Sequence, residues 1–257
     1  MARARSMALL FSAAAMLATG CSAPQVSDEL PRFRTGPVER TDRTLAACDF
    51  VPGVVGDRAD ERWFEVVEGD GVGALIVERT QRDGREIERT EERGGERFER
   101  MLLEQSEDGE IWLHIVERPR DDARSVFLTP LRFALRDHPS EGVCRGSAEM
   151  EVRSVRNDEV RARGRAKREV RIVGECEVER YGVRETAVVA EMRFDLVLDI
   201  ARAEVRVELF VVPGSGIVAE RRVERRILFG IPLGRTVETV VLTDAPPASA
   251  GSVAPAE

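Results

Sequence analysis

Apolar and charged residues alternate most regularly along residues 191–217, EMRFDLVLDIARAEVRVELFVVPGSGI. One set of alternate positions holds Met192, Phe194, Leu196, Leu198 and Ile200, and a second set holds Val205, Val207, Leu209 and Val211. Because successive side chains of a strand point to opposite faces, each set predicts one half-buried β-strand. The short connection at residues 201–204 then makes the two strands an antiparallel hairpin.

The charges of this hairpin favour one register. Pairing Ile200 with Val205 also places Asp199 opposite Arg206, whereas a slip by two residues would place Asp199 opposite Glu204. Opposite charges stabilise directly paired positions, and like charges destabilise them. We therefore predict the register in which Ile200 pairs with Val205.

Turn signals recur along the rest of the chain at the spacing of an antiparallel meander. They are Gly69-Asp70-Gly71, Asp83-Gly84, Gly94-Gly95, Asp108-Gly109, Asn157-Asp158 and Pro213-Gly214. Between them the alternation predicts strands near residues 62–68, 72–79, 85–92, 97–105, 110–117, 125–133, 143–155, 160–173, 175–184, 186–200, 205–212, 217–228 and 235–242. Residues 85–105 also show helical spacing, but the two glycines in their middle disfavour a helix. The succession favours one all-β domain.

A second hairpin, around Asn157, also allows a register prediction. A three-residue loop at residues 157–159 places Val152 opposite Gly164 and Met150 opposite Ala166, with Arg168 interrupting the inner face. The small inner side chains leave room either for a packed neighbour, which is the interpretation we favour, or for a ligand. The core or ligand-facing candidates of the two hairpins are Met150, Ala162, Gly164, Ala166, Phe194, Leu196 and Leu209.

The N-terminus has the pattern of an export signal. Basic residues at positions 3 and 5 precede an apolar run at residues 7–18, which is too short to span a bilayer. The following Leu17-Ala18-Thr19-Gly20-Cys21 resembles the lipobox of bacterial lipoprotein signal peptides. The resemblance implies cleavage after Gly20 and a diacylglycerol thioether on Cys21, and multiple acyl chains give stable membrane anchoring. The alternative is an ordinary secretory signal with an incidental cysteine.

These features divide the chain into four parts. We expect a signal peptide at residues 1–20, a proline-containing flexible tether at 21–44, the β domain at 45–243 and a disordered tail at 244–257. Ser22, rather than an aspartate, follows the cysteine. In Gram-negative lipoproteins the absence of aspartate at this position resembles a sorting signal for the outer membrane. We therefore expect the protein to be anchored at the periplasmic face of that membrane.

The charge balance argues against nucleic acid as a partner. The formal net charge is −8, and removing the leader, which holds Arg3 and Arg5 and no acidic residue, makes it −10. One basic stripe, Arg161, Arg163, Arg165 and Lys167, could meet anionic lipid. We favour instead a solvated strand face that Glu149 and Glu151 neutralise.

Three further cysteines, Cys48, Cys144 and Cys176, predict one disulfide and one free thiol in an oxidising compartment. The hairpin register favours Cys144 with Cys176, provided that the chain folds back at Gly174, and Cys48 remains a competitor for either partner. No cysteine lies in a Cys-x-x-Cys pair and the chain has only two histidines, so we expect no metal site.

Catalytic patterns are weak. Residues 213–217, Pro-Gly-Ser-Gly-Ile, lack the strand-to-helix setting of a nucleophile elbow, and His114 and His138 fit structural roles. We expect no enzyme activity, no catalytic residue and no cofactor.

Two short segments resemble a family. Cys48-Asp49-Phe50-Val51-Pro52, with Gly56 and Trp63 after it, and the segment Val211-Val212-Pro213-Gly214-Ser215-Gly216-Ile217-Val218 are similar to motifs of uncharacterised bacterial lipoproteins of the domain-of-unknown-function class. The resemblance implies a single, strongly curved antiparallel sheet, a half-barrel or open barrel distantly similar to periplasmic lipoprotein carriers, which hold acyl chains on an apolar concave face.

Together these observations predict a membrane-anchored binding or scaffolding module for an apolar envelope ligand, such as a lipid, or for an envelope protein. The alternative is a purely structural lipoprotein with a filled core. An apolar cavity of at least several hundred Å³ would favour a carrier.

Overall fold

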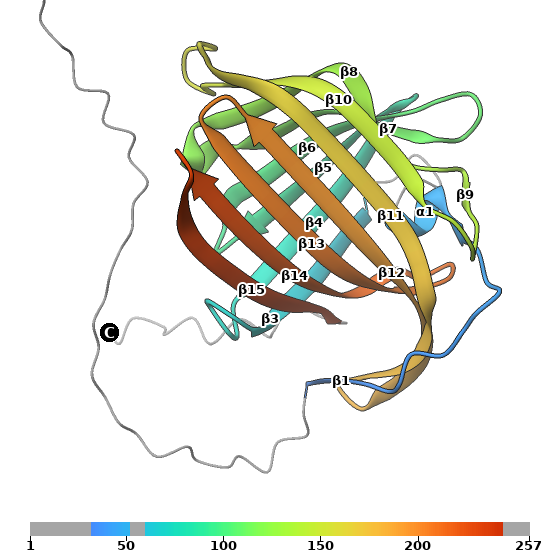
Figure 1. Cartoon of the computed structure of the whole chain (residues 1–257). Coiled ribbons are helices and arrows are strands. Elements are labelled where there is room, and N and C mark those ends of the chain that lie inside the picture. The colour runs from blue at the N-terminus through green and yellow to red at the C-terminus, as the bar shows by residue number, and fades with distance from the viewer. Residues whose placement is uncertain (1–31, 52–59, 244–257) are drawn as a thin grey trace, which may run out of the picture. The chain divides into compact units, whose positions relative to one another are not determined.

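The computed structural model describes residues 32–51 and 60–243, and they are almost entirely β-structure (Figure 1). The predicted leader, Cys21 and the C-terminal tail lie outside the described residues. The strands are β1 (Phe33–Thr35), β2 (Leu45–Ala46), β3 (Asp60–Glu68), β4 (Leu75–Asp83), β5 (Glu86–Arg93), β6 (Glu96–Gln105), β7 (Ile111–Arg118), β8 (Ala123–Ala134), β9 (Asp137–His138), β10 (Cys144–Arg153), β11 (Val160–Arg180), β12 (Val183–Leu198), β13 (Ala201–Val212), β14 (Gly216–Leu228) and β15 (Ile231–Thr243). Helix α1 spans Ala47–Phe50, and a 3-10 turn spans Pro119–Asp121.

The predicted meander is present, but it closes on itself. Apart from the short β1, β2 and β9, each strand pairs antiparallel with the next one along the chain, and β15 pairs with β3 to complete a barrel of twelve strands. The antiparallel sheet that we predicted is confirmed, but it forms a closed barrel rather than the predicted half-barrel or open barrel. Closure pairs the backbone edges that an open sheet would leave free.

The hairpin of residues 191–217 has the predicted faces and a different register. Its apolar positions point into the barrel core, which confirms the alternation. However, Phe194 lies opposite Val205 and Asp195 opposite Glu204, so the predicted Ile200–Val205 pairing is wrong by six positions. The turn takes only Asp199 and Ile200, and residues 201–204, predicted as the connection, belong to β13.

Ion pairs along each strand, and one diagonal pair between the strands, compensate for the like charges that this register places opposite each other. Arg193 lies across from Arg206, yet it contacts Asp195 at 3.1 Å and Glu204 at 3.4 Å. Arg206 contacts Glu204 at 2.8 Å. Because diagonal neighbours are within reach of long side chains, directly opposed charges alone do not determine register.

The hairpin around Asn157 shows a similar shift. Met150 pairs with Gly164 rather than Ala166, because the turn is longer than three residues and a bulge interrupts the ladder after Val152. A Cβ on Gly164 would lie 2.0 Å from the Val197 carbonyl oxygen. The small inner residues therefore admit the neighbouring strand β12, which is the close packing that we favoured.

The basic stripe on the outside of β11 is neutralised, as predicted, although its partners differ. Glu151 contacts Arg163 at 3.0 Å, Glu149 contacts Arg165 at 3.4 Å, and Arg161 pairs with Asp122.

Strand β11 continues through Gly174, where we expected the chain to fold back. It runs for 21 residues, with a register shift between Ile172 and Gly174 that changes which side chains point inward. Beyond it, Cys176 and Val178 join a second apolar cluster on the outer face, with Phe33 packed against it. Residues 36 and 39 also bond to the β11 backbone, so the folded part includes residues 32–44, which the sequence suggested were tether.

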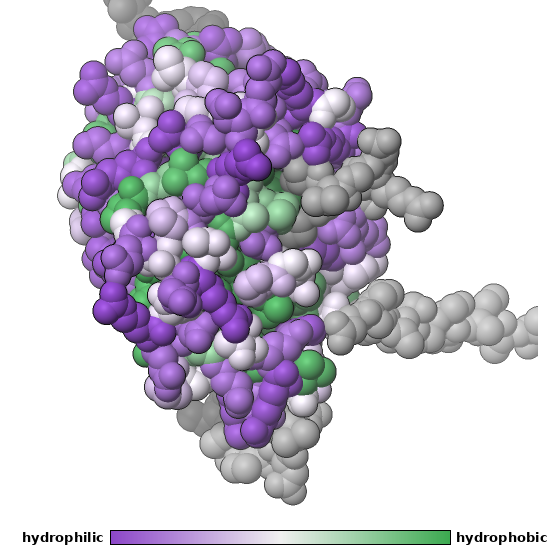
Figure 2. All heavy atoms as spheres, turned by 90° about the vertical axis from the view of Figure 1, so that its right-hand side faces the viewer, coloured by the Kyte–Doolittle hydropathy of each residue, from purple (hydrophilic) through white to green (hydrophobic). Residues whose placement is uncertain are grey.

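The outer surface around α1 and β9 is mainly hydrophilic. Figure 2 shows this side of the barrel, where hydrophilic residues predominate and hydrophobic residues form scattered spots between them. The main apolar core therefore lies within the barrel.

Candidate functional site

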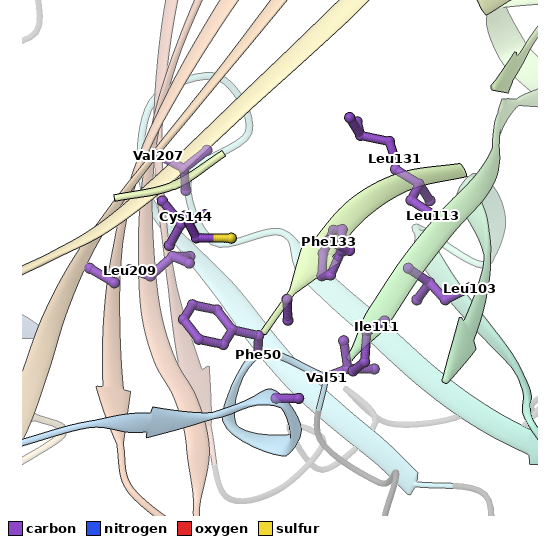
Figure 3. Close-up of a cluster of buried hydrophobic side chains, with 14 of the residues drawn as sticks. Phe50, Val51, Leu103, Ile111, Leu113, Leu131, Phe133, Cys144, Val207 and Leu209 are labelled. Atoms are coloured by element: carbon purple, nitrogen blue, oxygen red, sulfur yellow. The ribbon is translucent and has the colours of Figure 1, made fainter. Parts of the chain in front are cut away.

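The barrel interior is the first place to look for a ligand, because barrels of this size commonly enclose cavities or channels. Helix α1 enters one end of it. Leu45, Phe50 and Val51 are fully or almost fully buried in the main core, and Figure 3 shows the Phe50 ring lying between Leu209 and Cys144 on one side and Phe133 on the other. The helix therefore acts as a plug.

Asp49 holds this plug in place. Its carboxylate accepts a hydrogen bond of 2.8 Å from the Ala46 backbone N–H and one of 2.9 Å from the Gly214 backbone N–H. The first bond closes the N-terminus of α1, and the second ties α1 to the β13–β14 turn. The buried carboxylate thus satisfies two donors in separate parts of the chain.

The fold brings most of the candidate ligand-facing residues together, but they pack against one another and against the rest of the core. Met150, Ala166 and Leu209 belong to the main core, and Phe194 and Leu196 pack against it. Ala162 is also buried. These residues have the positions expected of a core, and the plug fills the space beside them.

Arg168, which the sequence marked as an interruption, is the unusual member of this core. It is 2% exposed, donates a hydrogen bond to the Phe133 carbonyl, places its Nε 3.2 Å from the Met192 sulfur, and lies over the Phe133 ring. No carboxylate of the described residues lies within ion-pair distance. Burial lowers the Arg168 pKa to about 10.

His138 lies nearby and is kept neutral. Burial, and then the charge of Arg168, lower the His138 pKa to about 4. Its Nε2 accepts a hydrogen bond of 2.9 Å from the Leu135 backbone N–H, and its ring lies 4.5 Å from that of Phe50. These contacts give His138 a structural role in holding β9 against the plug.

A second region of the interior is charged. Arg93 binds Glu238 through two hydrogen bonds of 2.7 and 2.9 Å and contacts Glu91 at 2.7 Å. Arg89 pairs with Glu78 beside it. Further inward-facing charges are Glu99, Arg118, Glu220 and Arg222, of which Glu99 and Arg118 pair at 2.9 Å. Burial raises the Glu220 pKa.

Sequence reasoning missed this charged region because it assigned charged residues to the outer face. A signal was present: residues 86–93, EIERTEER, and 220–226, ERRVERR, each contain one apolar residue, so charge occupies both sets of alternate positions. Successive side chains of a strand point to opposite faces of the sheet. When charged residues occupy both sets of alternate positions, some of them must therefore face the interior of the barrel.

A small cavity lies among these charges. Phe64, Ile76 and Ile217 line its apolar side, and the space open to the centres of water molecules is about 30 Å³. That is room for about two water molecules, since each needs roughly 10–15 Å³ by this measure. Arg222 Nε, which lacks a protein partner, could bond to one of them. An acyl chain does not fit.

The predicted Cys144–Cys176 disulfide is not formed, and Cys48, Cys144 and Cys176 are all free thiols. Cys144 lies in the core, whereas the register shift in β11 places Cys176 in the outer cluster, across the sheet. Burial raises the pKa of all three thiols, which lowers their reactivity.

The described residues contain no group of three or more His, Cys, Asp or Glu side chains arranged to hold a metal ion. No helix among them is long and apolar enough to span a membrane.

Comparisons of the chain with protein family models, with curated proteins and with solved structures found no match.

Proposed function

We propose that this protein is a membrane-anchored envelope lipoprotein whose barrel works through its outer surface, as a scaffold or docking module for an envelope protein. The observation that carries this proposal is the filled interior. Phe50 and its neighbours occupy the apolar part, ion pairs occupy the charged part, and the cavity among these charges has only about 30 Å³ open to the centres of water molecules. A ligand-binding pocket of ordinary size has about 300–1,000 Å³.

The way the plug is held supports the same choice. Asp49 accepts hydrogen bonds from the Ala46 N–H at the start of α1 and from the Gly214 N–H in the β13–β14 turn, and Phe50 contacts the buried His138 ring. Removing α1 would expose apolar core and leave two backbone N–H groups without their acceptor. A carrier of acyl chains needs instead a cavity that opens at low cost.

Anchoring through Cys21 rests on the leader and its lipobox-like segment, and the periplasmic face of the outer membrane rests on Ser22. The expected result of Cys21→Ser is loss of lipid labelling and release of the protein into the soluble fraction. Unchanged partition into the membrane would overturn the lipoprotein proposal.

Native mass spectrometry of the mature protein from its own membrane tests the filled barrel. We expect the mass of the chain plus its covalent acyl groups, with no second lipid retained. A non-covalent lipid bound at one copy per chain, and released when the barrel unfolds, would favour the carrier instead.

A further inference from the structure

The turn between β14 and β15 presents large apolar side chains to water. Phe229 is 67% exposed, Ile231 is 65% exposed and Leu233 is 50% exposed. The β12–β13 turn lies against it, because the Phe229 backbone N–H donates a hydrogen bond of 3.0 Å to the Ile200 carbonyl. We name Phe229, Ile231 and Leu233 the apolar tip. A cluster of this kind at one place on the surface indicates contact with another apolar phase.

The geometry of the turn does not explain its aromatic residue. Phe229 has φ +50° and Gly230 has φ +78°, the positive values that a tight two-residue hairpin turn requires. Asn or Asp adopts this conformation more readily than Phe does. Phe229 therefore costs stability in the turn and exposes its ring, so its role lies outside the fold.

Three arginines stand behind the apolar tip. Arg225 lies directly opposite Arg235, an arrangement that disfavours the fold, and Arg202 lies opposite Ile227 on the adjoining strand pair. All three are exposed. No ion pair joins any of them to a carboxylate of the described residues, whereas the arginines of the β11 stripe are paired. Glu204 lies opposite Arg225, but it already pairs with Arg193 and Arg206, so positive charge exceeds negative charge at this place on an acidic protein.

We propose that this surface docks on a bilayer of anionic phospholipid. The apolar tip would enter the boundary between headgroups and acyl chains, while Arg202, Arg225 and Arg235 would reach the phosphates, since long basic side chains extend to that level. A few side chains at one turn suffice for such insertion. They are too few for a stable protein interface, which buries about 800 Å² on each partner.

The test is vesicle flotation of the chain from Ser22 to Glu257, which keeps every described residue and carries no acyl anchor. We expect binding to vesicles of phosphatidylglycerol and phosphatidylcholine, weakened by salt, and little binding to phosphatidylcholine alone. Because the chain carries a net charge of −10, binding to anionic vesicles must come from a local surface.

Two variants and a matched control identify that surface. Phe229→Ser/Ile231→Ser should lose at least tenfold in affinity, and Arg202→Gln/Arg225→Gln/Arg235→Gln about fivefold per arginine. Arg161→Gln/Arg163→Gln/Arg165→Gln changes the net charge equally on the paired stripe and should bind almost as the parent does. Thermal unfolding checks that each variant is folded, and Phe229→Trp supplies a second readout through quenching by brominated lipid.

Three outcomes would overturn the proposal. They are no binding of the parent to anionic vesicles, equal losses in the tip and stripe variants, and a self-association of the parent that Phe229→Ser abolishes. The last would assign the surface to a second copy of the chain. None of them bears on the filled barrel or on Cys21, because the tested chain lacks the anchor.

Discussion

Asp49 accepts a hydrogen bond of 2.9 Å from the backbone N–H of Gly214, which lies 165 positions further along the chain. This contact joins the plug to the β13–β14 turn, and the Ala46 N–H shares the same carboxylate. Asp49→Ala should therefore lower the free energy of unfolding by about 2–4 kcal/mol, because hydrogen bonds to a charged acceptor contribute most. Urea unfolding measures the loss. Asp70→Ala, in an exposed turn, should cost less than about 0.5 kcal/mol, and equal losses would show that the two hydrogen bonds of Asp49 do not stabilise the fold.

Leu209 and Glu208 are neighbours on β13 that face opposite sides of the sheet. Leu209 belongs to the core, so Leu209→Ala should cost about 2–5 kcal/mol, and Phe194→Ala a similar amount toward the lower end, because Phe194 is only partly buried. Glu208→Ala should cost well under about 1 kcal/mol, as should Arg193→Ala. A larger loss in the charged variants, measured by urea unfolding, would reverse the assignment of the inner face.

The neutral His138 predicts a loss of stability in acid. Its pKa is about 4 in the folded chain and 6.5 in the unfolded chain, so the unfolded chain binds more protons between these values. Stability should therefore fall as pH decreases from about 6.5 to 4, by about 3 kcal/mol in total at 1.36 kcal/mol per unit. Unfolding at pH 7, 5.5 and 4 measures the parent.

His138→Gln isolates this contribution from the carboxylates that titrate in the same range. Its side-chain oxygen can accept the Leu135 N–H, and it does not ionise. We expect the parent to lose about 3 kcal/mol more than the variant between pH 7 and 4. Parallel pH profiles would contradict a buried neutral histidine.

Arg89 and Arg79 test the charged part of the interior against the outer surface. Arg89 pairs with Glu78, whose side chain is 7% exposed, whereas Arg79 pairs with Glu61, whose side chain is 41% exposed. Arg89→Met should cost about 3–5 kcal/mol because it removes the ion-pair partner of a buried carboxylate. Arg79→Met should cost less than about 1 kcal/mol. Thermal and urea unfolding of the two variants should differ accordingly, and similar losses would mean that water screens the interior pairs fully.

Alternation along the sequence was sufficient to predict most strands, and it predicted the inner face where one set of alternate positions is apolar, as in β12 and β13. It could not determine register. Register depends on turn length and on bulges, such as the one in β11 near Gly174, and a single extra residue there moved Cys176 from the inner face to the outer one. The predicted disulfide failed for that reason.

Closure of the barrel, and the pairing of the charges inside it, required information that no local pattern carries. The pairing of β15 with β3 joins segments near opposite ends of the chain, and each looks like an ordinary edge strand by itself. The inward Arg93 and Glu238 also lie far apart in sequence, so neither one alone indicates a partner. Asp49 was noticed as part of a motif, but its role depends on Gly214, which only the fold brings close.

The ring is joined where Trp63, near the start of β3, pairs with Thr243, the last residue of β15. At synthesis rates of about 5–20 residues per second, β3 must wait roughly ten to forty seconds for its second neighbour. During that interval an unpaired strand edge is open to other chains, which is the usual route to aggregation of β-proteins. A newly made chain therefore exposes the edge of β3 until its final strand arrives.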